Sequence, residues 1–260
     1  MKEQSEEMFA EERKQIILDL VNEHEKITVK ELCTEFSVSP ATIRNDLRAL
    51  EGYGLLKRTH GGAVSNSKVG FEPVFEIKET EKKNEKRAIG KYALRFLQDN
   101  DVIILDTGST ALEFAKQISR ELHLTVITND LRIASCLEKA NNITVVMLGG
   151  IIRKNYHYTL GSLIEDTIKN FNADKVFLGI NGLDIERGLT TSSLETSGIK
   201  KEFIKAAKSV IVLADSSKFG VAKLEKVADI TSVYAVVTDK KASDSYVSEI
   251  KKKGVKVYKA

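Results

Sequence analysis

Six short and almost entirely apolar runs in the second half of the chain limit the folds that it can adopt. They span residues 102–105, 124–127, 144–148, 176–178, 210–213 and 233–237. Strands that are apolar throughout are typical of a parallel sheet that helices cover on both faces. Segments with helical spacing lie beside them, at residues 88–97, 111–120, 131–140, 162–170, 194–208 and 243–253. The sequence therefore predicts a doubly wound α/β domain.

A different pattern fills residues 27–64, where two short helices are predicted. Thr28 is placed to cap the first helix, and Glu31 stands three residues later, as a capping box requires. Ser39-Pro40 then starts the second helix, because a serine cap and a proline at the first helical position both favour a helix start. Its outward-facing residues are small, amide or guanidinium side chains, which suit the major groove of DNA.

Residues 55–62 form an alternating basic segment, which we interpret as a β-wing. Residues 39–62 carry four basic and two acidic side chains, whereas residues 1–38 carry five basic and ten acidic ones. A surface that faces phosphates is expected to concentrate positive charge in this way. We therefore interpret residues 8–64 as a winged helix-turn-helix that binds double-stranded DNA; the alternative is a helical hairpin for protein contacts. The predicted DNA-binding residues are Thr28, Ser39, Pro40, Ala41, Thr42, Arg44, Asn45, Arg48, Lys57, Arg58 and His60.

Length and composition limit the number of domains and the class of protein. With 260 residues and 42% apolar content, the chain is long enough for two domains, which we place at residues 8–64 and 84–260 with a linker at 65–83. The net charge of +3 excludes a histone-like polycation. Two cysteines and four scattered histidines show no metal-ligand spacing, so no metal site is predicted. No signal peptide or membrane span is seen, and we expect a cytoplasmic protein.

A ligand crevice is expected where the carboxyl ends of the parallel strands meet. Gly108, Ser109 and Thr110 open directly into a helix and can offer N–H and hydroxyl groups to an anion, and Lys218 can add positive charge. Acidic and amide side chains nearby suit hydroxyl groups, so a phosphorylated sugar is the expected ligand. The predicted ligand-binding residues are Asp106, Gly108, Ser109, Thr110, Thr128, Asn129, Gly150, Asp184, Glu195 and Lys218.

Other interpretations of this crevice remain open. Each loop is also explained as a simple turn, since glycines and small hydroxyl residues are common after strands. The string Asp-Thr-Gly-Ser resembles the aspartic-protease signature, but a second copy and an all-β setting are missing. It also resembles the phosphate loop of sugar kinases, without a second nucleotide loop. No P-loop or dinucleotide fingerprint occurs, so ligand binding without turnover and without a cofactor is favoured.

Taken together, these segments resemble the DeoR family of bacterial transcriptional regulators, in the same order and over nearly the whole chain from about Arg13. The resemblance implies an effector domain similar to ribose-5-phosphate isomerase. It also implies a regulator, usually a repressor of carbohydrate-use genes, that responds to a phosphorylated sugar. The matching segments are TVKELCTEFSVSPATIRNDLRALEGYGLLKRTHGGAV, EKRAIGKYA, DVIILDTGSTALEFA, LTVITND, VVMLGG, ADKVFLGINGLD, GLTT and VLADSSKFG.

The family's recognition motif, TIRRDL, falls on residues 42–47, and Asn45 stands where a second arginine is usual. Asparagine can pair with adenine instead of guanine or phosphate, so this departure bears on the operator sequence. In the phosphate loop D-x-G-T-T, Ser109 replaces a threonine and keeps the hydroxyl.

Two further segments carry the family's ligand residues. Lys218 matches the lysine of its D-S-S-K segment, and Glu195 matches the acidic residue after the Gly-Leu-Thr segment, whereas Thr196 replaces a common alanine. We expect a homo-oligomer, a dimer or tetramer, whose paired winged helices bind two half-sites. The alternative is a sugar-phosphate isomerase or kinase-like enzyme with an appended DNA-binding head. An activator built from the same parts also stays open.

Overall fold

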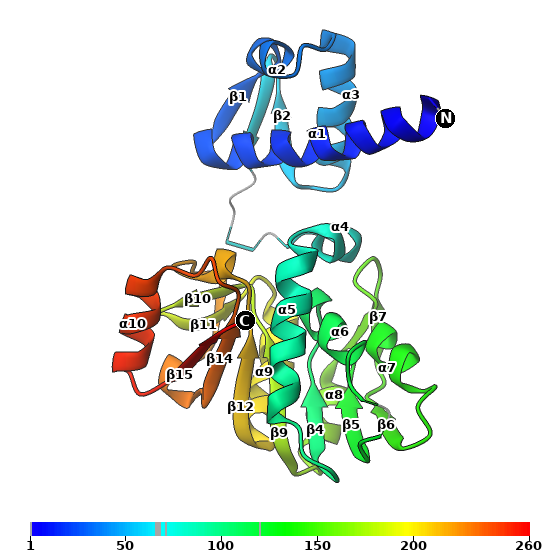
Figure 1. Ribbon diagram of the computed structural model, residues 1–260, viewed down its shortest axis with the longest axis vertical. Coiled ribbons are helices and arrows are strands. Elements are labelled where there is room, and N and C mark those ends of the chain that lie inside the picture. Colours follow the sequence, from blue (N-terminus) through cyan, green and yellow to red (C-terminus); the bar gives the residue numbers. More distant parts are fainter. Residues whose placement is uncertain (1, 66–68, 71, 120) are drawn as a thin grey trace. The chain divides into compact units, whose positions relative to one another are not determined.

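The computed structural model describes residues 2–65, 69–70, 72–119 and 121–260 (Figure 1). The chain divides into two compact units, the first ending at Pro73 and the second running from Val74 to Ala260. Residues 74–83, which the sequence assigned to the linker, are therefore part of the second unit. Residues 66–68 and 71 of that predicted linker lie outside the described residues.

The first unit is a winged helix-turn-helix in which three helices pack on a small antiparallel sheet with strand order β1-β3-β2. Helix α1 begins at Lys2, earlier than the predicted Met8. Buried aliphatic residues such as Ile17, Leu32 and Leu47 form its core. Its elements are α1 (Lys2–His24), β1 (Lys26–Thr28), α2 (Val29–Phe36), α3 (Pro40–Gly52), β2 (Leu56–Thr59) and β3 (Gly62–Ser65).

The predicted wing is the hairpin of β2 and β3, and β1 adds a third strand that was not predicted. Gly62 makes this third strand possible. A Cβ atom at Gly62 would lie 2.0 Å from the carbonyl oxygen of Ile27, so only glycine lets β1 and β3 approach this closely. The three-residue strand β1 is too short for its side chains to show a period of two.

The second unit is built around a seven-stranded sheet with strand order β15-β14-β12-β9-β4-β5-β6. Its first elements are α4 (Phe75–Thr80), α5 (Lys83–Ala93), the 3-10 turn η1 (Leu94–Phe96), β4 (Val102–Leu105), α6 (Ser109–Ala115), β5 (Leu124–Thr128), α7 (Leu131–Leu137), β6 (Ile143–Met147), β7 (Ile151–Arg153), β8 (Tyr158–Leu160) and α8 (Ser162–Ile168). The remaining elements are β9 (Ala173–Gly179), β10 (Gly182–Asp184), β11 (Gly188–Thr191), α9 (Leu194–Lys205), β12 (Ala207–Leu213), η2 (Ser216–Lys218), β13 (Glu225–Ala228), η3 (Ile230–Ser232), β14 (Ala235–Thr238), α10 (Asp244–Lys252) and β15 (Lys256–Lys259).

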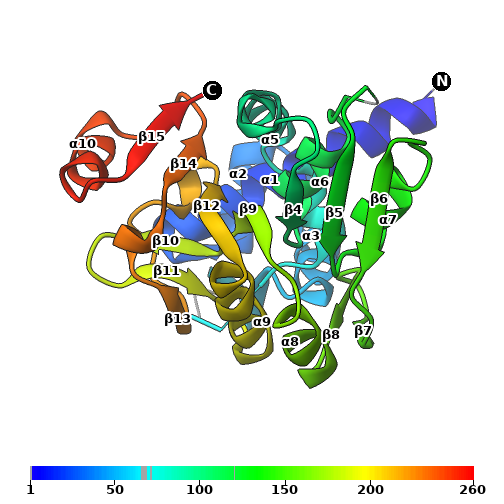
Figure 2. The same cartoon turned by 90° about the horizontal axis from the view of Figure 1, so that it is seen from below.

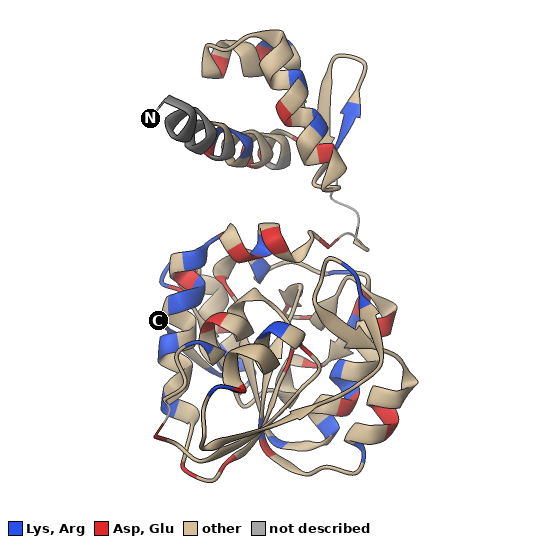
Figure 3. Ribbon diagram, turned by 90° about the vertical axis from the view of Figure 1, so that its right-hand side faces the viewer, with Lys and Arg blue, Asp and Glu red and all other residues tan. Residues whose placement is uncertain are grey.

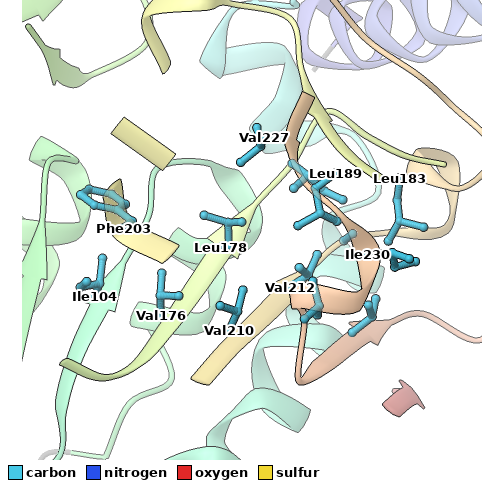
Figure 4. Close-up of a cluster of buried hydrophobic side chains, with 14 of the residues drawn as sticks. Ile104, Val176, Leu178, Leu183, Leu189, Phe203, Val210, Val212, Val227 and Ile230 are labelled. Atoms are coloured by element: carbon cyan, nitrogen blue, oxygen red, sulfur yellow. The ribbon is translucent and has the colours of Figure 1, made fainter. Parts of the chain in front are cut away.

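All neighbouring strands of the seven-stranded sheet are parallel, as the apolar runs predicted. Helices α5 and α6 lie on one face of the sheet, and α8 and α9 on the other (Figure 2). Successive strand residues alternate between the two faces: Val176 and Leu178 belong to one buried cluster (Figure 4), and Phe177 belongs to the other. Both clusters are fully apolar, which explains why the strands lack polar alternation.

Several elements differ from the prediction. Strands β7, β8, β10, β11, β13 and β15 are short and contain polar or charged residues, so no apolar run marks them. Helix α6 ends at Ala115 and not at Arg120, which lies outside the described residues. Helix α4 was predicted as part of the linker because half of its residues, in the sequence Phe-Glu-Ile-Lys-Glu-Thr, are charged.

The strand order also locates the crevice. The chain moves outwards from β4 to β5 and β6, and then returns to place β9 on the other side of β4. A doubly wound sheet opens at such a switch point, beyond the carboxyl ends of the two strands. The loops after β4 and β9 are therefore expected to form the centre of a ligand site.

Candidate functional site

The start of each short helix in the first unit is fixed by the predicted caps. The Thr28 hydroxyl accepts a hydrogen bond from the Glu31 N–H at 3.2 Å, and the Glu31 carboxylate accepts one from the Thr28 N–H at 2.7 Å. The Ser39 hydroxyl accepts from the Thr42 N–H at 3.2 Å, and Pro40 occupies the first turn of α3. Both caps order the region near the predicted DNA surface, and Thr28 acts there as a capping residue.

The recognition helix α3 exposes the side chains that were predicted to read DNA. Arg44, Asn45 and Arg48 are all exposed, and Ile43 and Leu47 are buried on the opposite side. The Arg48 guanidinium donates a hydrogen bond to the Asn45 side-chain oxygen at 2.9 Å. The side-chain oxygen of Asn45, the residue that departs from the family's motif, is thus engaged by Arg48, and this bond does not use its amide N–H groups.

Asp46 explains how an acidic residue can lie in a helix that faces phosphates. Its carboxylate is 5% exposed and is turned toward α1, where it accepts hydrogen bonds from Arg13 at 2.6 and 3.3 Å. The bidentate pair removes the negative charge from the exposed face and fixes α3 against α1. Sequence reasoning missed Arg13, which gives no local signal because it lies 33 residues from its partner.

A hollow of about 540 Å³ lies where α2, α3 and the wing meet. Arg44 from α3, Lys30 from α2, and Arg58 and His60 from the wing line it. Figure 3 shows basic residues on α3 and on the wing strand β2. The first unit therefore gathers cationic side chains from three elements around one concave surface, which suits a phosphate backbone. Lys30 was not predicted, although it follows the capping Thr28 closely.

Arg58 is less free than its neighbours on the wing. Its guanidinium donates to the Glu51 carboxylate at 2.5 Å, and its backbone N–H donates to the same carboxylate at 3.0 Å. These hydrogen bonds hold the pKa of Glu51 below its ordinary value. Lys57 and His60 are exposed, and Arg58 must share its charge between Glu51 and any phosphate.

In the second unit, the residues after β4 and β9 meet as the topology requires. Asp106 is 1% exposed, and its carboxylate accepts hydrogen bonds from the Gly179 N–H at 2.9 Å and from the Lys200 ammonium. Lys200 also donates to the Gly179 carbonyl at 2.9 Å. The carboxylate of Asp106, which was predicted to bind a hydroxyl group, is thus engaged by an ion pair. Lys200 was missed because it lies on α9, far along the chain.

The predicted anion loop is adjacent to a buried carboxylate. Gly108 has φ +130° and precedes α6, Ser109 is buried, and Thr110 is half-buried. The Gly108 N–H points to the Asp130 carboxylate at 3.4 Å, which also accepts from the N–H groups of Arg132 and Ile133. Burial raises the pKa of Asp130 to about 6, against the effect of these hydrogen bonds.

The loop after β5 supplies a buried amide. The Thr128 hydroxyl accepts from the Asp130 N–H at 3.1 Å, and the Asn129 amide donates to the Thr159 carbonyl at 2.9 Å. Among the described residues, the side-chain oxygen of Asn129 has no hydrogen-bond partner, and neither has the Ser192 hydroxyl. Both side chains are under 5% exposed. Buried polar atoms of this kind are commonly completed by a ligand or by water.

Three other predicted ligand residues have structural roles or lie at the surface. A Cβ at Gly150 would come within 2.3 Å of the Leu160 carbonyl, so this glycine allows close packing of the chain. The Asp184 carboxylate accepts from the N–H groups of Glu186 and Arg187, which is a turn contact. Glu195 is exposed in the first turn of α9.

Thr196, where the family commonly has alanine, is part of a buried hydroxyl network. Its hydroxyl lies 3.0 Å from that of Thr191, which donates to the Asn181 side chain at 2.9 Å. Thr196 also donates to the Ser193 carbonyl at 3.1 Å. The network orders the loop after β9 at the crevice, which gives the extra hydroxyl a packing role.

Lysines gather at the carboxyl end of β12. Lys218 is half-buried in η2, and the Lys82 ammonium lies 3.8 Å from the buried Asp215 carboxylate. Burial raises the pKa of Asp215, but the charges of Lys218, Lys82 and Lys86 and a hydrogen bond from Ser217 outweigh it and hold that pKa below its usual value. Lys82 and Lys86 were not predicted as site residues, because lysines at a charged helix start are typical of a solvated surface.

Neither a metal site nor a membrane helix is found in the part of the chain that the structure describes. There, no group of three or more His, Cys, Asp or Glu side chains is arranged to hold a metal ion. Among those same residues, no helix combines the length and apolarity needed to cross a bilayer.

Comparison with known proteins assigns each of the two units to a domain family. The DeoR-like helix-turn-helix domain matches residues 13–69, and the DeoR C terminal sensor domain matches residues 81–240. The chain is 36% identical over 250 residues to the uncharacterized HTH-type transcriptional regulator YulB of Bacillus subtilis (strain 168), covering 96% of each chain. It is 31% identical over 250 residues to the HTH-type transcriptional repressor GlcR of the same organism, again covering 96% of each.

Among solved structures, a ribose 5-phosphate isomerase A from Methanocaldococcus jannaschii is similar, with a TM-score of 0.40, 20% sequence identity, and coverage of 54% of this chain and 55% of that one. The two domain matches lie in the order of the two units, and the full-length relatives are helix-turn-helix regulators. The protein is a member of the DeoR family of transcriptional regulators.

Proposed function

We propose that the protein represses carbohydrate-use genes by binding an operator through its winged helices, and that a phosphorylated sugar bound to the second unit controls this binding. The observation that carries the proposal is the hollow at which Lys30, Arg44, Arg58 and His60 converge. Cations from three elements around one concave surface favour a polyanion over a small ligand.

On DNA, the two groups of basic residues would have different tasks. Arg44, Asn45 and Arg48 stand on one exposed face of α3 and would contact base edges in the major groove. Lys57 and His60 on the wing would contact phosphates and fix the register. Ser39 caps α3, and Pro40, Ala41 and Thr42 begin it; these four residues would lie close to the DNA.

In the second unit, the chemistry of the crevice favours a ligand with both an anionic group and hydroxyl groups. The lysines around Asp215 supply positive charge, and Ser109 and Thr110 at the start of α6 can supply N–H and hydroxyl donors. The buried side-chain oxygen of Asn129 can accept a hydrogen bond from a sugar hydroxyl. A sugar phosphate meets each of these requirements.

The relatives' names support repression over activation. GlcR is a transcriptional repressor, and a second relative from Escherichia coli O157:H7, 29% identical over 248 residues, is a putative aga operon transcriptional repressor. We propose two or more copies per operator, since two winged helices read two half-sites with more affinity and selectivity than one. We expect ligand binding without turnover.

The test is a mobility-shift titration at fixed salt, with DNA from beside the protein's own gene and a panel of sugar phosphates. Specific binding that one sugar phosphate weakens supports both parts of the proposal. Specific binding that no compound changes contradicts the effector part. If the protein binds no DNA sequence selectively but converts a sugar phosphate in an isomerase assay, the enzyme alternative is correct.

Lys218 can be tested in the same titration. If Lys218 contacts the effector's phosphate, Lys218→Ala binds the operator as the parent does but needs a higher effector concentration to respond. An unchanged effector response would exclude this lysine as the phosphate contact.

A further inference from the structure

Lys86 links the lysine cluster of the crevice to helix α4. It lies in α5, which precedes β4 and therefore begins at the edge of the sheet where the parallel strands end. Its side chain is 5% exposed, and its ammonium donates to the Lys78 carbonyl and, at 2.6 Å, to the Glu81 carbonyl. Both carbonyls belong to the end of α4, where a helix leaves acceptors without intrahelical partners. Lys86 is thus the cap of α4.

This ammonium has little countercharge. Within the described residues, no carboxylate lies within 4.0 Å of it. Burial lowers the pKa of Lys86 to about 8; the charges of Asp215 and Glu81 oppose this change, and those of Lys218 and Lys78 add to it. Asp215 itself is shared with Lys82 and Lys218. A buried cation that lacks a close anion at a predicted anion site is suited to receive one.

The remaining hydrogen-bonding capacity of Lys86 determines whether a bound anion strengthens or breaks its bonds to α4. An ammonium has three N–H donors, and the two carbonyls of α4 take two of them. An anion can therefore bind the third donor while both carbonyl bonds persist. Its charge also keeps the ammonium protonated, which strengthens the bonds to α4.

Other side chains already hold the rest of α4 in place. Phe75 is buried under the Arg132 guanidinium, which lies 4.4 Å from the ring centroid, and Arg132 also donates to Glu79 at 2.9 and 3.1 Å. The His157 ring lies 3.0 Å from the Glu76 carboxylate. These contacts hold Phe75, Glu76 and Glu79 and involve no lysine of the crevice. The Lys86 cap is therefore the contact of α4 that an anion in the crevice can change.

We propose that the anionic group of the effector binds Lys86 and thereby stabilises helix α4. This helix is the first element of the second unit (the sensor unit), and it follows the first unit (the DNA-binding unit) along the chain. The inference rests on the proposed function, because it assumes an anionic effector at this crevice. It adds the residue through which the bound ligand reaches the connection between the two units.

The experiment compares hydrogen–deuterium exchange of the full chain in inorganic phosphate and in chloride at equal ionic strength, with phosphate affinity measured by calorimetry. The variant is Lys86→Met, which keeps the length of the side chain and removes the charge. The control is Lys91→Met, which removes the same charge from an exposed position of the same helix.

We expect phosphate to slow exchange at the end of α4, where the Glu81 N–H donates to the Ile77 carbonyl. In Lys86→Met, phosphate should bind about tenfold more weakly and leave α4 exchange unchanged, because a charge-assisted hydrogen bond is lost. Lys91→Met should behave as the parent does.

Equal phosphate affinity in the parent and in Lys86→Met would overturn the contact. Unchanged or faster α4 exchange in the parent would overturn the stabilisation of α4, and this result needs no variant, so it holds even if Lys86→Met does not fold. If the parent binds neither phosphate nor any sugar phosphate, the effector part of the proposed function fails as well. If it binds them and only the Lys86 results are negative, the inference fails alone.

Discussion

The candidate sites of the two units differ in whether their charges are exposed or buried. In the DNA-binding unit, Arg44, Arg48 and Lys57 are exposed, and their charge is available to a partner. In the sensor unit, Asp106 and Lys200 are at most 5% exposed and pair with each other. DNA supplies many phosphates from outside, so its site needs accessible cations. A small ligand requires an interior whose charges are already placed and desolvated, and this requirement couples its site to the stability of the fold.

The largest expected effect is at the buried pair of the sensor unit. Lys200→Met leaves the Asp106 carboxylate buried without its cation, and we expect a loss of about 3–5 kcal/mol in the free energy of unfolding. Urea denaturation, followed through the unfolding of the sensor unit, measures this loss. The exposed Lys208, paired with Asp174, is the matched control, and Lys208→Met should change little.

The double variant Asp106→Asn with Lys200→Met makes this test stricter. Removing both charges should recover part of the lost stability, because no uncompensated charge remains buried. If Lys200→Met is as stable as the Lys208→Met control, the sensor unit does not depend on its buried charges, and the contrast between the units is wrong.

In the DNA-binding unit, removing a charged side chain should lower the affinity for DNA and not the stability of the fold. We expect Arg44→Ala to weaken operator binding by about 1–3 kcal/mol and to relax the sequence preference, with unchanged stability. Selection from random DNA, followed by titration at fixed salt, measures both effects. Arg187→Ala, which removes an exposed arginine from the other unit, serves as the control. An unchanged preference in Arg44→Ala would remove this arginine from base recognition.

A smaller effect concerns pH and Asp130. Its pKa is raised to about 6 in the folded protein, above the ordinary 3.8, so between these values the folded state binds more protons than the unfolded state. Stability from this group therefore increases as pH falls through 6. Relative to Asp130→Asn, the parent should gain about 1 kcal/mol between pH 7 and pH 5. A constant difference between the two proteins in urea titrations would show that this carboxyl does not titrate in that range.

The smallest expected effect is on the wing. Lys57 is exposed, and we expect Lys57→Ala to lower the slope of log affinity against log salt by about one, without a change in sequence preference. Titrations at several salt concentrations measure the slope. A slope equal to that of the parent would mean that Lys57 contacts no phosphate, and it would reduce the DNA surface to α3 and its neighbours.

The comparison also explains what could be predicted from the sequence. The caps at Thr28 and Ser39 and the apolar faces of α3 depend on residues a few positions apart, and the structure confirms them. The parallel sheet was predictable because each strand packs between two apolar layers. The buried pair of Asp106 and Lys200 was not, since 94 residues separate its members and only the folded sheet brings them together.

Helix α4 and Lys86 were missed for a related reason. A charged segment without apolar spacing is typical of a linker, and a lysine among other charged residues is typical of a solvated helix start. Only the tertiary contacts of Phe75 and of the Lys86 ammonium distinguish them. The ligand residues predicted in the crevice stay predictions, although the structure places Asp106, Gly108 and Asn129 at the carboxyl ends of the central strands.

The central claim is that the ligand crevice and the DNA surface are energetically coupled. Its most direct test is calorimetric titration of the sugar phosphate into the free protein and into the protein bound to its operator. A coupled system requires different affinities in the two titrations, by about fivefold or more for typical allosteric proteins, and the effector must change DNA affinity by the same factor. Equal affinities in both titrations would contradict the account, because a ligand that does not distinguish the two states cannot control DNA binding.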